Sequence, residues 1–68
     1  MNNKFRAYHG SHENVMGTNV YVKFPTGFVE GKVIEYIFPK RGIIGHYKVR
    51  RADGQTMSTS IIYIKEEK

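Results

Sequence analysis

The sequence predicts a small all-β fold in which five antiparallel strands close into a barrel. From Thr18 onward, apolar and polar residues alternate with a period of two, and tight-turn signals separate the alternating runs. No stretch of about eleven residues shows helical periodicity. The 68 residues allow one domain, and the chain has no cysteine that could staple it with a disulfide. We expect a closed sheet, because closure removes the edges that so small a domain could hardly protect.

Residues 1–17 differ in composition from the rest of the chain. The segment MNNKFRAYHGSHENVMG is polar, rich in Asn and His, and has no sustained period. We interpret it as an N-terminal tail that is flexible or loosely docked, with Phe5, Tyr8, Val15 and Met16 as the side chains able to dock it. The barrel domain is then expected over residues 18–66.

The first two strands are expected over residues 18–24 and 28–38, on either side of a Pro-Thr-Gly turn. The alternation places Val20, Val22 and Phe24 on one face of the first strand. In the second strand it places Val29, Val33 and Ile37 inward, and Phe28, Lys32 and Tyr36 outward. Gly31 indicates a bulge or sharp bend, and Ile34 breaks the alternation, which is typical of a bent strand.

The remaining strands follow two further turns. Pro39-Lys40-Arg41-Gly42 predicts a charged turn, and residues 43–51 predict a third strand with Tyr47 and Val49 inward. Asp53-Gly54 is a strong hairpin signal, and residues 56–60 after it predict a fourth strand. Residues 61–64 predict one 3₁₀ turn followed by a closing fifth strand.

This pattern resembles a known class of domain. The stretches GTNVYVKFPTGFVEGKVIEYIF and GHYKVRRADGQTMSTSIIYI are similar to the SH3-like barrels of the Tudor and KOW type. Those barrels share a tight turn after the first strand, a glycine in the second, a Y-x-V third strand, and a short strand that ends in a 3₁₀ turn. The resemblance covers residues 17–66 and implies the fold more strongly than the function.

The charge of the chain points to an anionic partner. Eleven Lys and Arg residues against six Asp and Glu residues give a net charge of +5. Solubility alone is an alternative explanation of this charge. Basic and aromatic residues alternate out of three adjacent strands or lie at their ends, and they form a candidate nucleic-acid-binding face: Tyr21, Lys23, Lys32, Tyr36, Lys40, Arg41, His46, Lys48, Arg50 and Arg51.

Aromatic residues near the first turn suggest a second kind of site. Phe24, Phe28, Tyr36 and Tyr47 flank this turn or lie beside it in the predicted barrel. The resemblance to Tudor domains implies that such a cluster could cage a methylated Lys or Arg by cation–π attraction. The alternative is that Phe24 and Tyr47 belong to the core, since they share the inward face with Val20 and Val49.

The sequence offers little for catalysis. There is no Cys nucleophile and no Ser in a nucleophile-elbow pattern, so we expect no catalytic residues, no cofactor and no metal. His9, His12 and Glu13 have the spacing of a metal half-site, yet such sites need three or four ligands. The SH3-like barrels that the chain resembles include one enzyme, the oligomeric type II dihydrofolate reductase. Its Val-Gln-Ile-Tyr signature has a counterpart at residues 60–63, where the ligand-contacting Gln is missing.

These observations predict a non-catalytic binding module that acts on nucleic acid or on a protein of the nucleic-acid machinery. The alternative is a Tudor-type protein-interaction adaptor, which includes a small viral or mobile-element protein that modulates a host protein. A reductase-like enzyme is a remote third. We expect nucleic acid or an acidic protein surface as partner, no membrane association and a cytoplasmic location, and we leave homo-oligomerisation open.

Overall fold

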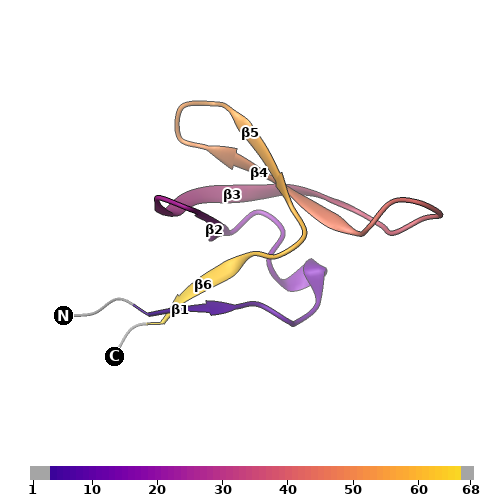
Figure 1. Ribbon diagram of the computed structural model, residues 1–68, viewed down its shortest axis with the longest axis horizontal. Coiled ribbons are helices and arrows are strands. Elements are labelled where there is room, and N and C mark those ends of the chain that lie inside the picture. The colour runs from indigo at the N-terminus through magenta and orange to yellow at the C-terminus, as the bar shows by residue number, and fades with distance from the viewer. Residues whose placement is uncertain (1–3, 67–68) are drawn as a thin grey trace.

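A computed structural model describes residues 4–66 of the chain as a single antiparallel sheet (Figure 1). The strands lie in the spatial order β1-β6-β2-β3-β4-β5. Their bounds are Lys4–Ala7 (β1), Asn19–Phe24 (β2), Gly27–Ile37 (β3), His46–Arg51 (β4), Thr56–Thr59 (β5) and Tyr63–Glu66 (β6), with a 3₁₀ turn, η1, at His12–Asn14. The predicted all-β fold with antiparallel strands is therefore confirmed.

The sheet has six strands and is not closed, which corrects the predicted five-stranded barrel. Among residues 4–66, β5 pairs only with β4 and β1 pairs only with β6, so these two strands form the edges of the described sheet. The sheet bends strongly instead, and the β4–β5 hairpin stands away from the β6–β1 pair (Figure 1). Both edge strands are four residues long, which limits the row of unpaired backbone groups that each edge presents.

Part of the segment expected to be a tail lies in the sheet as β1, while residues 1–3 of that segment lie outside the described part of the chain. Lys4 to Ala7 pair in register with Glu66 to Tyr63, and the Tyr8 amide donates to the carbonyl of Ile62 over 2.9 Å. Beyond η1, Val15 lies in the core with only 4% of its surface exposed. The four residues KFRA are too short a run for alternation to predict a strand. Pairing with β6, which the local sequence does not reveal, stabilises this strand.

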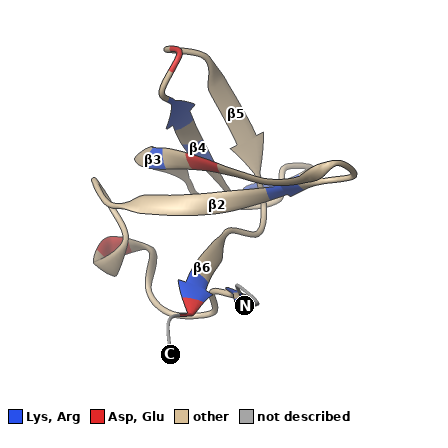
Figure 2. Cartoon of the chain, turned by 90° about the vertical axis from the view of Figure 1, so that its left-hand side faces the viewer, with Lys and Arg blue, Asp and Glu red and all other residues tan. Residues whose placement is uncertain are grey.

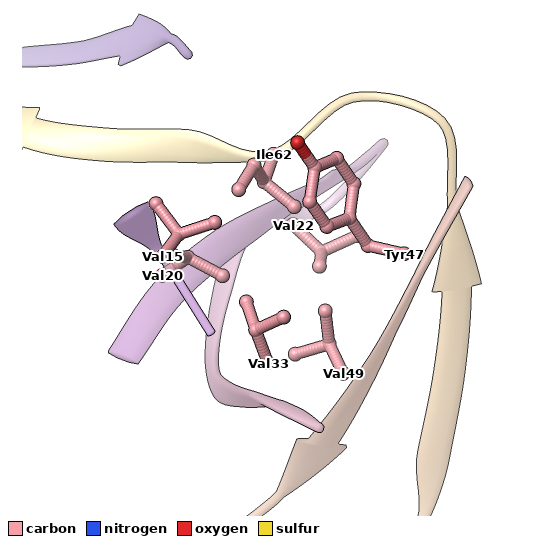
Figure 3. Packing of buried hydrophobic residues seen from close by; sticks show 7 residues of the cluster. All are labelled: Val15, Val20, Val22, Val33, Tyr47, Val49 and Ile62. Atoms are coloured by element: carbon pink, nitrogen blue, oxygen red, sulfur yellow. The ribbon is translucent and has the colours of Figure 1, made fainter. Parts of the chain in front are cut away.

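The core lies on the inner side of the bend (Figure 3), and we call this side of the sheet the core face. The prediction that Val20, Val22, Val33 and Val49 are buried is confirmed. The remaining buried residues are Val15, Tyr47 and Ile62, and Ile62 comes from the segment that precedes β6. Burial of these side chains is the main force that holds so small a sheet together.

A β-bulge at Ile34 reverses the alternation in the second half of β3. Val33 lies opposite Val49, but Glu35 lies opposite Lys48, so Ile34 has no partner on β4. Tyr36 consequently lies opposite Tyr47 and packs against the core, whereas the sequence predicts it to face outward. Ile37, predicted to face inward, lies on the other side opposite His46. One extra residue in a strand is sufficient to exchange its faces.

Gly31 is close to the bulge but has a different role. A Cβ atom at this position would lie 2.5 Å from Cγ1 of Val49 and 2.9 Å from the carbonyl oxygen of Arg50. The glycine therefore allows β3 to approach β4 closely, while the irregularity itself falls at Ile34.

The other differences from the predicted elements are at strand ends. β4 begins at His46, so residues 43–45 belong to the β3–β4 loop instead of the strand. No 3₁₀ turn precedes β6; there the Thr59 hydroxyl donates to the carbonyl of Ile61 over 2.8 Å. Within residues 4–66, no helix is long and apolar enough to cross a membrane.

Candidate nucleic-acid interface

Four basic side chains lie on the face opposite the core, which we call the outer face. Lys23 comes from β2, Lys32 from β3, and Lys48 and Arg50 from β4. Each alternates with a core residue of its own strand, as the period of two predicts. Figure 2 shows basic segments on the neighbouring strands β3 and β4. The register spreads these side chains along the sheet, because Lys23 lies opposite Phe28, Lys32 opposite Arg50 and Lys48 opposite Glu35.

Lys32 and Arg50 lie directly opposite each other across the β3–β4 ladder. Like charges in this position repel and destabilise a sheet. Among the described residues, neither side chain has a carboxylate within ion-pair distance, whereas the neighbouring Arg51 pairs with Asp53 at 3.5 Å. The pair Lys32–Arg50 thus places two positive charges together without an ion pair to either among the described residues.

A shallow hollow of about 420 Å³ opens beside this pair. It is lined by Asn19, Glu30, Gly31, Lys32, Ile34, Arg50, Arg51 and Ala52. Ammonium and guanidinium groups on its walls, with an amide nearby, are donors suited to an anionic group such as a phosphate.

Two carboxylates share the outer face with the basic residues. Glu30 lies there by simple alternation with Val29 and Gly31. Glu35 lies there because of the bulge, and its cross-strand neighbour is Lys48. Glu30 lines the hollow and lowers the positive charge beside Lys32, and Glu35 lowers it beside Lys48.

An aromatic patch lies on the same face toward β1 and β6, and consists of Phe5, Tyr21, Phe28 and Tyr63. The rings of Phe5 and Phe28 stack with centroids 3.9 Å apart, and Phe5 meets Tyr21 edge-on at 4.9 Å. Tyr63 contacts Phe28 at 5.2 Å. Sequence reasoning missed Phe5 and Tyr63 as members of this face, and the alternation of Phe5 with Lys4 and Arg6 was the one signal available. The patch joins the basic residues through Lys23, which lies opposite Phe28.

The predicted aromatic cluster of Phe24, Phe28, Tyr36 and Tyr47 does not form a single site. Tyr36 and Tyr47 are in contact at 4.9 Å on the core face, and Phe24 packs against the core. Phe28 lies on the opposite face in the aromatic patch. Burial raises the pKa of the Tyr47 phenol, with smaller contributions from Tyr36 and Tyr8. A cage built from these four rings is therefore not present in the structure.

The other predicted site residues lie at the ends of β4. Lys40 and Arg41 are exposed in the β3–β4 loop. His46 begins β4, and its Nδ1 donates to the carbonyl of Ile44 over 2.8 Å. Arg51 ends β4 and is held by Asp53. Of the predicted set, the structure brings Lys32, Arg50 and Arg51 together in the hollow, and it separates Tyr36 from all of them.

Residues considered for metal binding and catalysis have other surroundings. The ring of His12 stacks on Tyr36 at 4.4 Å, and within residues 4–66 no three His, Cys, Asp or Glu side chains gather closely enough to hold a metal ion. In the reductase-like segment 60–63, Ile62 is fully buried and Tyr63 lies in the aromatic patch.

Comparisons of this chain with protein-family models, with curated proteins and with solved structures find no match. The chemistry of the face therefore follows from its own side chains. It offers cationic donors beside aromatic rings, which are the groups that neutralise phosphates and stack on bases.

Proposed function

We propose that the protein is a non-catalytic module that binds nucleic acid through the outer face of its sheet. The observation that carries this proposal is the direct opposition of Lys32 and Arg50 above a hollow. Two cations held together destabilise the free protein, and a phosphate between them would turn the repulsion into attraction. A site of this kind is easier to explain by an anionic ligand than by solubility, for which any exposed position would serve.

The two parts of the face have complementary roles in this proposal. Lys32, Lys48 and Arg50 contact phosphates, which supplies affinity without sequence preference. Lys23 lies between them and the aromatic patch, where Tyr21 and Phe28 offer half-buried rings to a base or sugar. A nucleic-acid strand that crosses the sheet from β4 toward β1 would contact the basic side chains first and the aromatic patch second.

We also infer that the fold is an open variant of the SH3-like barrel. The order β6-β2-β3-β4-β5 supports this, because it places the last strand beside the first of the predicted five. The short β5 and the added β1 distinguish the chain from a closed barrel.

Salt-dependent titration of a fluorescent oligonucleotide tests the proposed function. Arg50→Ala should weaken binding to all sequences alike and flatten the slope of log affinity against log salt by about one. The matched control is Arg6→Ala, which removes an exposed cation from β1 that faces away from the aromatic patch and lies near Glu66. Absence of binding in low salt at micromolar protein would contradict the proposal, as would equal effects of the two substitutions.

A protein-interaction adaptor is the second candidate, favoured by the free edge of β5. Thr56 to Thr59 pair with β4 on one side only, so their other edge can accept a strand from a partner. Binding of that kind would persist in high salt and after nuclease treatment, whereas binding through phosphates would not.

A further inference from the structure

The loop between β3 and β4 extends away from the sheet as an ordered projection, seen at the right of Figure 1. We call residues 38–45 the finger. Lys40 and Ile43 exchange both backbone hydrogen bonds, at 3.0 and 2.8 Å, around a turn in which Gly42 has a φ of 78°. That positive φ belongs to the second central position of a type II turn and favours glycine. Together with the bond from His46 to the Ile44 carbonyl, the turn gives the finger a defined shape.

The finger exposes apolar side chains to a degree unusual in a small domain. Ile44 is 75% exposed, Phe38 60% and Ile43 45%. Lys40 and Arg41 are exposed beside them. Single exposed apolar residues are ordinary, but three on one projection indicate a surface that another molecule covers.

The charge of the surrounding segment indicates what that molecule is. Between Glu35 and Asp53 the chain has five Lys and Arg residues and no Asp or Glu. Two of the five lie at the tip of the finger, and Lys48, Arg50 and Arg51 follow on β4 over about 10 Å, at roughly 3.3 Å per residue. A compact acidic pocket on a partner protein would need only the two cations at the tip. An extended row of cations matches an extended row of phosphates.

We propose that the finger enters a groove of duplex DNA and inserts Ile44 against a base step, while Lys40 and Arg41 contact the flanking phosphates. The finger is a narrow loop closed by the Lys40–Ile43 bridge, and a narrow projection can enter a groove of B-DNA. Apolar wedges flanked by cations unstack and kink base steps. This proposal rests on the proposed function and adds the ligand class and the mode of contact. Lys32 on β3 and Arg50 on β4, outside the finger, then contact the backbone of the same duplex.

Bending of a labelled duplex tests the inference. A duplex of about 20 base pairs carries a donor dye and an acceptor dye at its two ends, and energy transfer between them reports the bend. Wild type should bind and increase the transfer. Ile44→Ser should lose at most about tenfold in affinity and should no longer bend the duplex, because one apolar contact is lost. The slope of log affinity against log salt should be unchanged, because every cation remains.

Two further variants separate the wedge from other effects. Phe38→Ser, at a second of the three exposed apolar positions of the finger, should also reduce the bend. The control is Ile61→Ser, which alters an isoleucine that is 48% exposed outside the finger, between β5 and β6, and should behave like wild type. Circular dichroism of each variant should match that of wild type, since the substituted side chains are largely exposed.

The outcomes distinguish this inference from the proposed function. Binding without any bend, or a bend that Ile44→Ser and Phe38→Ser leave intact, overturns the wedge and leaves nucleic-acid binding in place. Absence of binding to single-stranded and duplex probes overturns both. Binding to phosphatidylserine vesicles that Ile44→Ser abolishes, with no bend of the duplex, would show that the finger contacts a lipid surface and would also overturn the wedge.

Discussion

Lys32 on β3 lies directly opposite Arg50 on β4, with both side chains on the outer face of the sheet. Their neighbours along the same strands, Val33 and Val49, lie opposite each other in the core. The backbone pairing that aligns the two valines therefore also brings the two cations together. Repulsion between them is a direct consequence of the register that the core requires.

Removal of one of these cations should stabilise the free protein. We expect Lys32→Gln to raise the free energy of unfolding by about 0.2–1 kcal/mol in low salt, with a smaller gain in high salt. Urea denaturation at two salt concentrations measures this. Lys23→Gln is the control, because Lys23 lies opposite Phe28 and is not repelled by a cation directly across the ladder. A Lys32→Gln protein less stable than the Lys23→Gln protein would contradict the prediction.

Truncation of a core valine should have a large effect. Val33 is 1% exposed, and Val33→Ala should lower the free energy of unfolding by about 1–3 kcal/mol through lost burial and the cavity left behind. The half-buried Val29 of the same strand provides the comparison, since Val29→Ala should cost less. Urea denaturation of both variants that gave equal losses would show that Val33 is not at the centre of the core.

The N-terminal strand should be visible by hydrogen exchange. The Tyr8 amide, bonded to the Ile62 carbonyl, should be protected to a degree similar to the Val33 amide, which donates to Thr18. Phe5→Ala should reduce the protection of Tyr8, because Phe5 anchors β1 by stacking on Phe28. Exchange of the Tyr8 amide at the rate of an unfolded peptide would restore the interpretation of residues 1–17 as a tail.

The phenol of Tyr47 should make the stability dependent on alkaline pH. Burial raises its pKa in the folded protein above the ordinary value of about 10. The unfolded chain therefore loses this proton first as the pH rises, so the contribution to stability is complete below about pH 10 and decreases above it until the folded protein titrates as well. Tyr47→Phe removes this dependence and leaves the lysines unchanged. Unfolding free energies of both proteins at neutral pH and above pH 10 measure the difference, and parallel curves would contradict the prediction.

Much of the sheet follows from local pattern. The valines of β2, β3 and β4 alternate with polar residues, and the turns at residues 25–26 and 41–42 fall within the segments that Pro and Gly indicate. The bulge at Ile34 does not follow from that pattern, because it depends on which residue of β3 lacks a partner on β4. Its consequence for Tyr36 was therefore beyond prediction from β3 alone.

The outer face was partly predictable for the same reason. Lys23, Lys32, Lys48 and Arg50 lie where alternation places them, because their strands are regular at those positions. The aromatic patch was not predictable, since Phe5 reaches it only by the pairing of β1 with β6 from the other end of the chain. Contacts between distant segments are the part of a small sheet that local periodicity does not report.

The pairing of β1 with β6 also determines when this protein can fold during its synthesis. β2 to β5 each meet a sequence neighbour and can form hairpins as they leave the ribosome. β1 is synthesised before β6 and has to wait for it, and Ile62, which precedes β6, completes the core only then. We therefore expect nascent chains that end before Ile62 to remain unfolded and protease-sensitive, and the native state to appear only once β6 is free to pair with β1.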